Sequence, residues 1–154
     1  MSAIAAAANL SLVAMVIFAA VSDIRSRRIP NWLVAAGLAL ALVAQVAAHG
    51  AATGALNWIG GTATGMAMLL AVYLIGGMGA GDVKLMGAVG AFLGAAGAAH
   101  VAMIGFLAGG ALAIAALLLR RGAAALKPAA RKPIRLPYAL AIAAATLLVK
   151  ANMV

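Results

Sequence analysis

The sequence predicts an all-helical integral membrane protein, a single domain over residues 1–154 built as a bundle of about six transmembrane helices. Composition is the first observation behind this prediction: 68% of the residues are hydrophobic and 8% are charged. Soluble domains carry about 25% charged residues, so too few charges exist here to cover a water-facing surface. The second observation is a series of apolar runs, several about as long as the ~20 residues that cross a bilayer.

Six such runs follow one another along the chain, and we expect each to form one membrane span. In order they are residues 4–22, 32–48, 56–75, 83–98, 100–119 and 138–153. The breaks between them are an arginine cluster, a neutral stretch, a glycine-rich segment, a short Gly/Ala stretch and a basic loop: 25–28, 49–55, 76–82, 94–99 and 120–135. The alternating ten-residue strands of a membrane β-barrel do not occur.

Charge and cysteine content exclude several functional classes. The chain has no cysteine, which rules out disulfides, thiol nucleophiles and thiolate metal sites. Its net charge of +9 would suggest nucleic acid as the partner of a soluble protein. Here the basic residues flank apolar runs, as topology signals do, so we expect the lipid bilayer and no nucleic acid. No metal or organic cofactor is expected, and the oligomeric state is left open.

The basic residues also predict how the bundle is oriented. Lys and Arg are held on the cytoplasmic side of a membrane protein. With the 25–28 loop inside and six alternating spans, ten of the eleven basic residues become cytoplasmic and only Lys150 does not. We therefore expect a multi-pass protein of the cell (inner) membrane with both termini on the extracytoplasmic side.

Small residues recur at four-residue spacing in several spans. The pairs are Gly61/Gly65, Gly90/Gly94 and Gly105/Gly109, a spacing that lets helix backbones approach closely in lipid. With 18 glycines, about two such pairs arise by chance, so they are a weak signal for a dimer motif. Close packing within one bundle is the better interpretation.

Only two acidic residues exist in the chain, Asp23 and Asp82. Each lies at the edge of an apolar run, where an ionisable group is costly unless it faces protein or water, and is therefore a candidate functional residue. The predicted topology puts the end of the first span and the start of the fourth on the cytoplasmic side. Charge bias and span counting together therefore place both carboxylates at one membrane depth. The structural alternative for each is a helix cap or a partner for a neighbouring Arg or Lys.

Two carboxylates that share a site form an acid–base pair. They do not both ionise easily, so one keeps its proton while the other acts as base. Such a pair can activate water against a peptide carbonyl. Helix dipoles favour the negative charge on Asp82, at a helix N-terminus, over Asp23, at a helix C-terminus. Our hypothesis is that Asp82 is the ionised member at rest.

The surroundings of Asp82 support a site. Gly79 and Gly81 belong to the glycine cluster directly before it, and glycine allows unusual backbone conformations and close approach of a substrate chain. Irregular backbone at membrane depth is tolerated where protein or a water-filled cavity satisfies its polar groups. Lys84 follows two residues later and either modulates Asp82 or reaches the headgroups. We expect Gly79, Gly81 and Lys84 to shape the site.

Two stretches resemble the motifs of the type IV prepilin peptidase family. The segment S-D-I-R-S-R-R-I-P-N, residues 22–31, is similar to its first aspartate motif. The segment G-A-G-D-V-K-L, residues 79–85, looks like its second, the GxGD signature of membrane aspartic proteases. Leu136-Pro137-Tyr138-Ala139 resembles, more weakly, the Pro-aromatic segment that opens the last span. The resemblance covers essentially the whole chain.

The resemblance implies an aspartic endopeptidase that removes the basic leader of prepilin-like membrane proteins at the cytoplasmic face. Asp23 and Asp82 take the catalytic roles, and Pro137 and Tyr138 shape the site. The bifunctional members carry an extra cytoplasmic segment, often with paired cysteines, to which nothing here corresponds. Methyltransferase activity is therefore not expected, and the compact form is similar to peptidases of Flp-type (tight-adherence) pilus systems, with archaeal preflagellin peptidases as a near alternative.

Two other functions compete with a peptidase. Intramembrane carboxylates also serve proton relays, so the chain is alternatively a proton or ion carrier, which predicts that glutamate replaces either aspartate without loss. A non-catalytic membrane subunit predicts that asparagine replacements are silent. The sequence does not identify the substrate or its route into the site.

Overall fold

Five helices account for nearly all of the described chain, residues 3–124 and 138–152, in the computed structural model. They are α1 (Ala3–Ser26), α2 (Asn31–His49), α3 (Ala51–Leu74), α4 (Ala80–Ala124) and α5 (Tyr138–Asn152), and no strand occurs in these ranges. The first three helices and residues 80–111 of α4 are each long and apolar enough to cross a membrane, and α5 is a shorter apolar helix. The predicted all-helical membrane class is confirmed.

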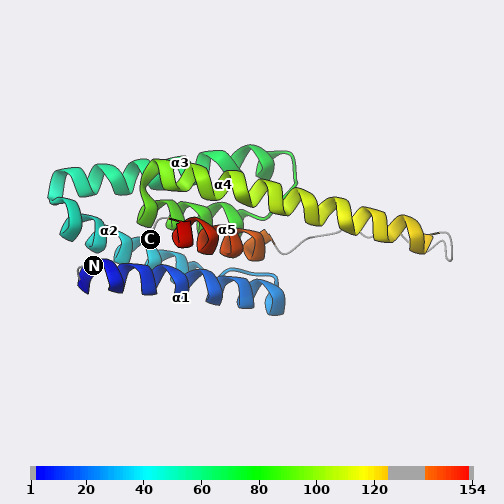
Figure 1. The fold of residues 1–154 in the computed structure, drawn as a ribbon, viewed down its shortest axis with the longest axis horizontal. Helices are drawn as coiled ribbons and strands as arrows, with labels where there is room; N and C mark the ends of the chain where they lie inside the picture. The colour runs from blue at the N-terminus through cyan, green and yellow to red at the C-terminus, as the bar shows by residue number, and fades with distance from the viewer. Residues whose placement is uncertain (1–2, 125–137, 153–154) are drawn as a thin grey trace.

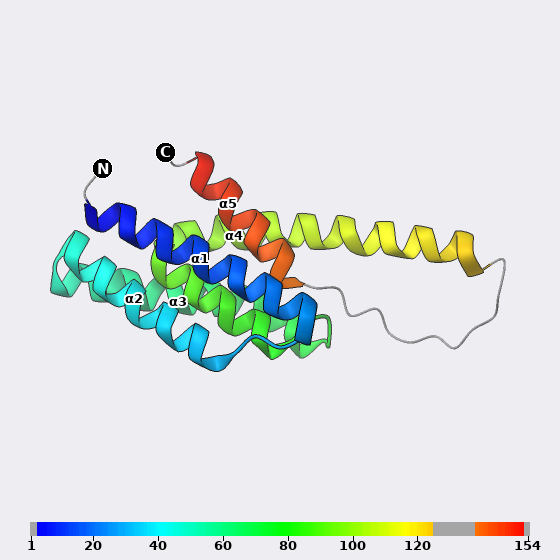
Figure 2. The same cartoon turned by 90° about the horizontal axis from the view of Figure 1, so that it is seen from below.

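The α4 element consists of two helical stretches that run in opposite directions. Gly94 is non-helical, with φ 71° and ψ 179°, and the chain reverses there in both views (Figures 1 and 2). The fourth and fifth predicted spans therefore both exist, inside one element. Their predicted limits of 98 and 100 are wrong, because the left-handed φ of one glycine makes the whole reversal and Ala95 already begins the second stretch.

Three further predicted boundaries differ from the structure. The expected neutral loop 49–55 is a corner at one residue, Gly50, whose φ of 81° suits glycine, and α3 begins at once with Ala51. The first helix runs past the predicted residue 22 to Ser26 and ends where Arg27 takes a left-handed φ of 51°. The basic loop expected at 120–135 begins within α4, and its residues 125–135 lie outside the described ones.

Close backbone contact joins α3 to the first stretch of α4. A Cβ built on Gly61 meets the Gly90 carbonyl group, and one built on Gly90 meets the Gly61 carbonyl group. One turn further on, a Cβ on Gly65 meets the Met86 carbonyl oxygen. Only glycine permits so near an approach, and the prediction of close packing within one bundle is confirmed for these pairs.

The polar side chain of Gln45 stabilises the reversal from α2. Its Nε2 donates to the carbonyl oxygens of Ala91 and Phe92, at 3.2 and 3.0 Å. The last carbonyls of a helix have no partner within the helix, and here the break at Gly94 leaves such groups inside the bundle. Gln45 is buried, 6% exposed, so it replaces the water that would otherwise satisfy them.

We expect Gln45→Leu to lower the free energy of unfolding by about 1–3 kcal/mol, because it leaves buried carbonyl groups without their donor. Gln45→Glu, which has no N–H to give, should lower it at least as much. Val43→Ala, at an exposed position of the same helix, is the control and should change it by no more than about 0.5 kcal/mol. Unfolding of the purified protein in detergent, followed by circular dichroism, measures the difference.

The bundle brings four helix ends and the start of α5 together. The ends of α1 and α3 and the starts of α2, α4 and α5 lie toward one end, whereas the start of α1, the α2–α3 corner, Gly94 and the end of α5 lie toward the other (Figures 1 and 2). The second stretch of α4 continues past the rest of the bundle (Figure 1). We call the first of these ends the carboxylate end, because it holds Asp23 and Asp82.

Candidate active site at the carboxylate end

Asp82 closes the N-terminus of α4. Its Oδ2 accepts a hydrogen bond from the Gly79 backbone N–H at 3.1 Å, and its own N–H donates to the Gly79 carbonyl oxygen at 3.1 Å. With Gly79 as the N-cap, Asp82 is the third helical residue, so this bond is the returning half of a capping box. The residue is 8% exposed. The carboxylate is therefore held in a fixed direction.

Asp23 lies in the last turn of α1 and is half-buried. Its carboxylate accepts a hydrogen bond from the backbone N–H of Ala139, in the first turn of α5. Arg27, one turn further along the chain, is close enough for its positive charge to act on the same carboxylate. The N-terminus of α5 thus binds Asp23 much as that of α4 binds Asp82.

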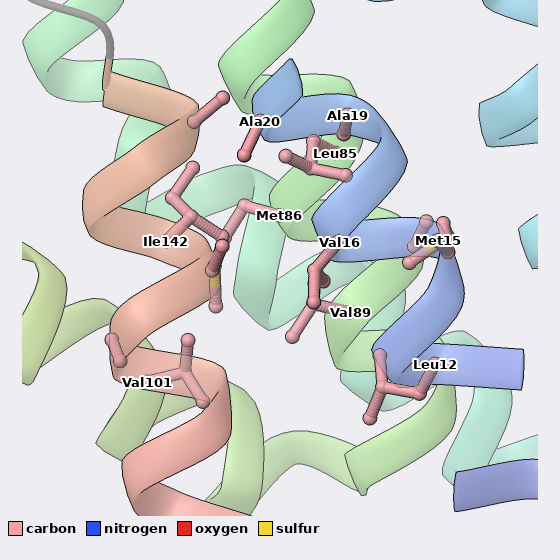
Figure 3. Close-up of a cluster of buried hydrophobic side chains, with 14 of the residues drawn as sticks. Leu12, Met15, Val16, Ala19, Ala20, Leu85, Met86, Val89, Val101 and Ile142 are labelled. Carbon is pink, nitrogen blue, oxygen red and sulfur yellow. The ribbon is translucent and has the colours of Figure 1, made fainter. Parts of the chain in front are cut away.

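The two carboxylates are neighbours. They are near enough for the charge of Asp23 to act on Asp82. The buried apolar core lies next to them. In it Ala19 and Ala20 of α1 lie beside Leu85 of α4 (Figure 3), and each of the three is about one helical turn from the aspartate of its own helix. Ala19 and Ala20 thus present small side chains to α4 at the level next to the two acids.

Tyr138 completes this group from the start of α5. Its phenol is close enough to Asp82 for the carboxylate charge to act on it. The ring packs on the bare backbone of Gly109 in the second stretch of α4, where a built Cβ would lie 2.5 Å from both the Cζ and the hydroxyl oxygen of Tyr138. Gly109 therefore leaves the space that the ring occupies.

Hydrogen bonds within the first motif fix the turn that follows Asp23. The hydroxyl of Ser22 donates to the Arg28 carbonyl oxygen at 2.8 Å, and that of Ser26 donates to the same oxygen at 3.3 Å and to the Ser22 carbonyl oxygen at 2.8 Å. Beyond this turn Ile29 packs against the second motif, since a Cβ on Gly81 would lie 3.4 Å from its side chain. The two motifs are thus in direct contact.

The glycines before Asp82 differ in what they contribute. Only Gly76 of this cluster has a left-handed φ, +78°, so it alone needs the conformational freedom expected of the cluster. Added Cβ atoms at Gly79 and Gly81 would make contacts of 3.4 Å, to Asp82 Oδ2 and to Ile29. Both are ordinary van der Waals distances, so neither position requires glycine for space or for its backbone conformation.

The structure does not place the other two expected site residues, Lys84 and Pro137, beside the carboxylates. Lys84 is exposed, and its Nζ donates to Asn31 Oδ1 of α2 at 3.2 Å. Together with Asn31 it lines a cavity of about 270 Å³ between α2, α3 and α4. Pro137 lies outside the described residues.

Sequence reasoning missed what four residues contribute to this site. Ala139 acts through its backbone N–H, for which the residue type gives no signal. Gly109 contributes the space that the Tyr138 ring occupies. In the sequence it was noticed only as a member of a spaced glycine pair. Ser22 and Ser26 are polar residues four apart at the end of an apolar run, a pattern that could have indicated a fastened helix end.

The site is made of carboxylates, a phenol and backbone amides. No group of three or more His, Cys, Asp or Glu occurs among residues 3–124 and 138–152, so the part of the chain that the structure describes offers no metal-binding cluster. These groups can transfer protons and can donate or accept hydrogen bonds.

Comparison with known proteins agrees with the two aspartate motifs. Residues 10–114 match the type IV leader peptidase family, a range that includes both motifs and most of α4 but not α5. No match to the chain was found among curated proteins or among solved structures. The matched range is well over half of the chain, and it contains the two neighbouring carboxylates: this membrane protein belongs to the type IV leader peptidase family.

Proposed function

We propose that this protein is an aspartic endopeptidase that removes the basic leader from prepilin-like membrane proteins, with Asp23 and Asp82 as its catalytic residues. The observation that carries the proposal is the pairing of the only two acidic side chains of the chain, close enough to feel each other's charge. Each also accepts one backbone N–H at a helix N-terminus.

In the proposed reaction the ionised aspartate takes a proton from a water molecule. At the same time the oxygen of that water attacks the scissile carbonyl carbon. The protonated aspartate donates a hydrogen bond to the carbonyl oxygen and stabilises the charge that develops there. The tetrahedral intermediate then breaks its C–N bond while a proton passes to the leaving amine. A carboxylic acid and a new amino terminus are the products, and the pair again holds one proton.

Position in the membrane supports a substrate with a charged leader and an apolar following segment. The carboxylate end carries Arg25, Arg27, Arg28 and Lys84, all exposed, and basic residues mark the cytoplasmic side. We propose that this end faces the cytoplasm at the inner membrane. A scissile bond between a water-soluble leader and a membrane helix would lie at this depth.

Co-expression with a prepilin-like protein tests the function. We expect wild type to shorten a substrate that has a basic leader ending in glycine, and Asp23→Asn and Asp82→Asn each to leave it uncut. His100→Gln, an exposed change in another part of the molecule, is the control and should cut normally. Mass spectrometry of the product identifies the cut bond. Continued cleavage in both aspartate variants would refute the assignment.

The contact of Tyr138 with Gly109 gives a second prediction. Gly109→Ala should displace the phenol ring, because the new methyl group overlaps it, and we expect leader cleavage to slow by about tenfold, as for a misplaced group in a preorganised site. Gly110→Ala, where nothing lies within 4 Å of the added Cβ, is the matched control and should leave the rate within about twofold. Equal cleavage rates in the two variants would show that the position of the Tyr138 ring does not matter for cleavage.

A further inference from the structure

A second cavity lies at the end of the bundle opposite the carboxylates. Its volume is about 510 Å³, and all five helices contribute to its lining. The lining is mixed: most of its residues are apolar, and the polar residues are Asn9, Gln45, His49, Asn57 and Lys150. A cavity of this size and composition is large for packing alone and is not part of the proposed peptidase site.

Lys150 brings a positive charge to this cavity without a negative side chain to balance it. Its Nζ donates to Asn9 Oδ1, a neutral oxygen. The chain has two acidic side chains, and both lie at the carboxylate end. An ammonium at the end of a membrane helix is stable when it reaches water or an anion, and Lys150 is half-buried.

From the mixed lining and the unbalanced ammonium we infer that this cavity binds the phosphate group of a phospholipid from the adjoining leaflet. The Lys150 ammonium pairs with the phosphate oxygens, and the amide nitrogens of Asn9 and Asn57 are available donors from α1 and α3. Apolar residues of the same cavity, among them Ile4 and Phe92, accommodate the glycerol and the first methylene groups. A free inorganic anion would gain nothing from these apolar walls.

The chain itself offers a matched comparison for Lys150. Lys84 also donates from its Nζ to an asparagine Oδ1, that of Asn31, but it is exposed and its cavity is about half as large. Both pairs are Lys–Asn contacts between two helices. If any Lys–Asn pair were enough to retain a lipid, replacing Lys84 would weaken lipid binding as much as replacing Lys150.

Native mass spectrometry of the detergent-purified chain with added phosphatidylglycerol tests the inference. We expect wild type and Lys84→Gln to retain one tightly bound lipid, and Lys150→Gln and Asn9→Ala to bind it at least tenfold more weakly. Lys150→Arg keeps the charge and should retain the lipid, which separates loss of the site from loss of the fold. Diacylglycerol, which lacks the phosphate, should not be retained.

Three results would overturn the inference. The first is equal lipid retention by wild type and Lys150→Gln. The second is loss of the lipid from Lys84→Gln as great as from Lys150→Gln. The third is displacement of the lipid by millimolar inorganic phosphate, which would make this a site for a free anion. Each result is independent of leader cleavage, so failure here leaves the proposed peptidase activity untouched.

Discussion

Replacing Asp23 or Asp82 by asparagine is expected to lower the rate of leader cleavage by at least about 10³-fold, and replacing both is expected to lower it no further. Groups that act as one unit show this strong non-additivity, because each is useless without the other. Asparagine has almost the same shape as aspartate. At position 82 its Oδ1 still accepts from the Gly79 N–H, so the helix cap is retained and the loss is chemical.

Glutamate at either position separates the peptidase from a proton or ion carrier. It keeps the charge but is longer by one methylene group, and Asp82 is buried at 8% exposure with its oxygen held on the Gly79 N–H. We expect Asp82→Glu to cleave at least about tenfold more slowly, since small misplacements of a reacting group are costly. A carrier would tolerate the change.

Rates for the wild type, the two asparagine variants, the double variant and the two glutamate variants should be measured with one purified substrate in one detergent. Circular dichroism and membrane accumulation show that each variant is folded. If each asparagine variant lost only part of the rate and the two losses added up in the double variant, a shared acid–base pair would be contradicted. Full activity in the glutamate variants would favour the carrier.

The second large effect is expected for Gly61→Ala, which should lower the free energy of unfolding by about 3 kcal/mol, at the upper end for an overpacked core. A Cβ at this position would lie 2.7 Å from the carbonyl carbon of Gly90 and 2.9 Å from the Cα of Gly94. Both are backbone atoms, which cannot rotate away as a flexible side chain does. The α3–α4 contact must open, and it includes the residue at which α4 reverses.

Gly60→Ala is the matched control for Gly61→Ala, because nothing lies within 4 Å of a Cβ on Gly60. Alanine favours a helix over glycine by about 1 kcal/mol, so this control should be as stable as wild type or more so. Titration of the detergent-solubilised variants with a denaturing detergent, followed by circular dichroism, gives both values. Equal stability of the two variants would show that the glycine contact is not tight.

Composition and charge determined the solvent, the class of fold and the pair of acids. With 68% hydrophobic residues and two acidic residues in 154, few places in the chain remained for acid–base chemistry, and Asp23 and Asp82 followed without any structure. Span limits were less predictable: single residues with left-handed φ, Arg27, Gly50 and Gly94, end the helices. The predicted run 83–98 continues across Gly94, and the predicted break 49–55 is wider than the single residue Gly50, so hydropathy alone does not locate these ends.

What the sequence could not supply was the environment of Asp23. Along the chain it stands at a helix C-terminus, which suggested that Asp82 alone is favoured as the ionised member. The folded chain adds the Ala139 N–H from the start of α5, so both acids accept a bond at a helix N-terminus and this criterion no longer distinguishes them. Composition and motif spacing predicted which two acids form the candidate site. Tertiary structure decided what each one contacts, because backbone amides carry no sequence signal and act only where packing brings them.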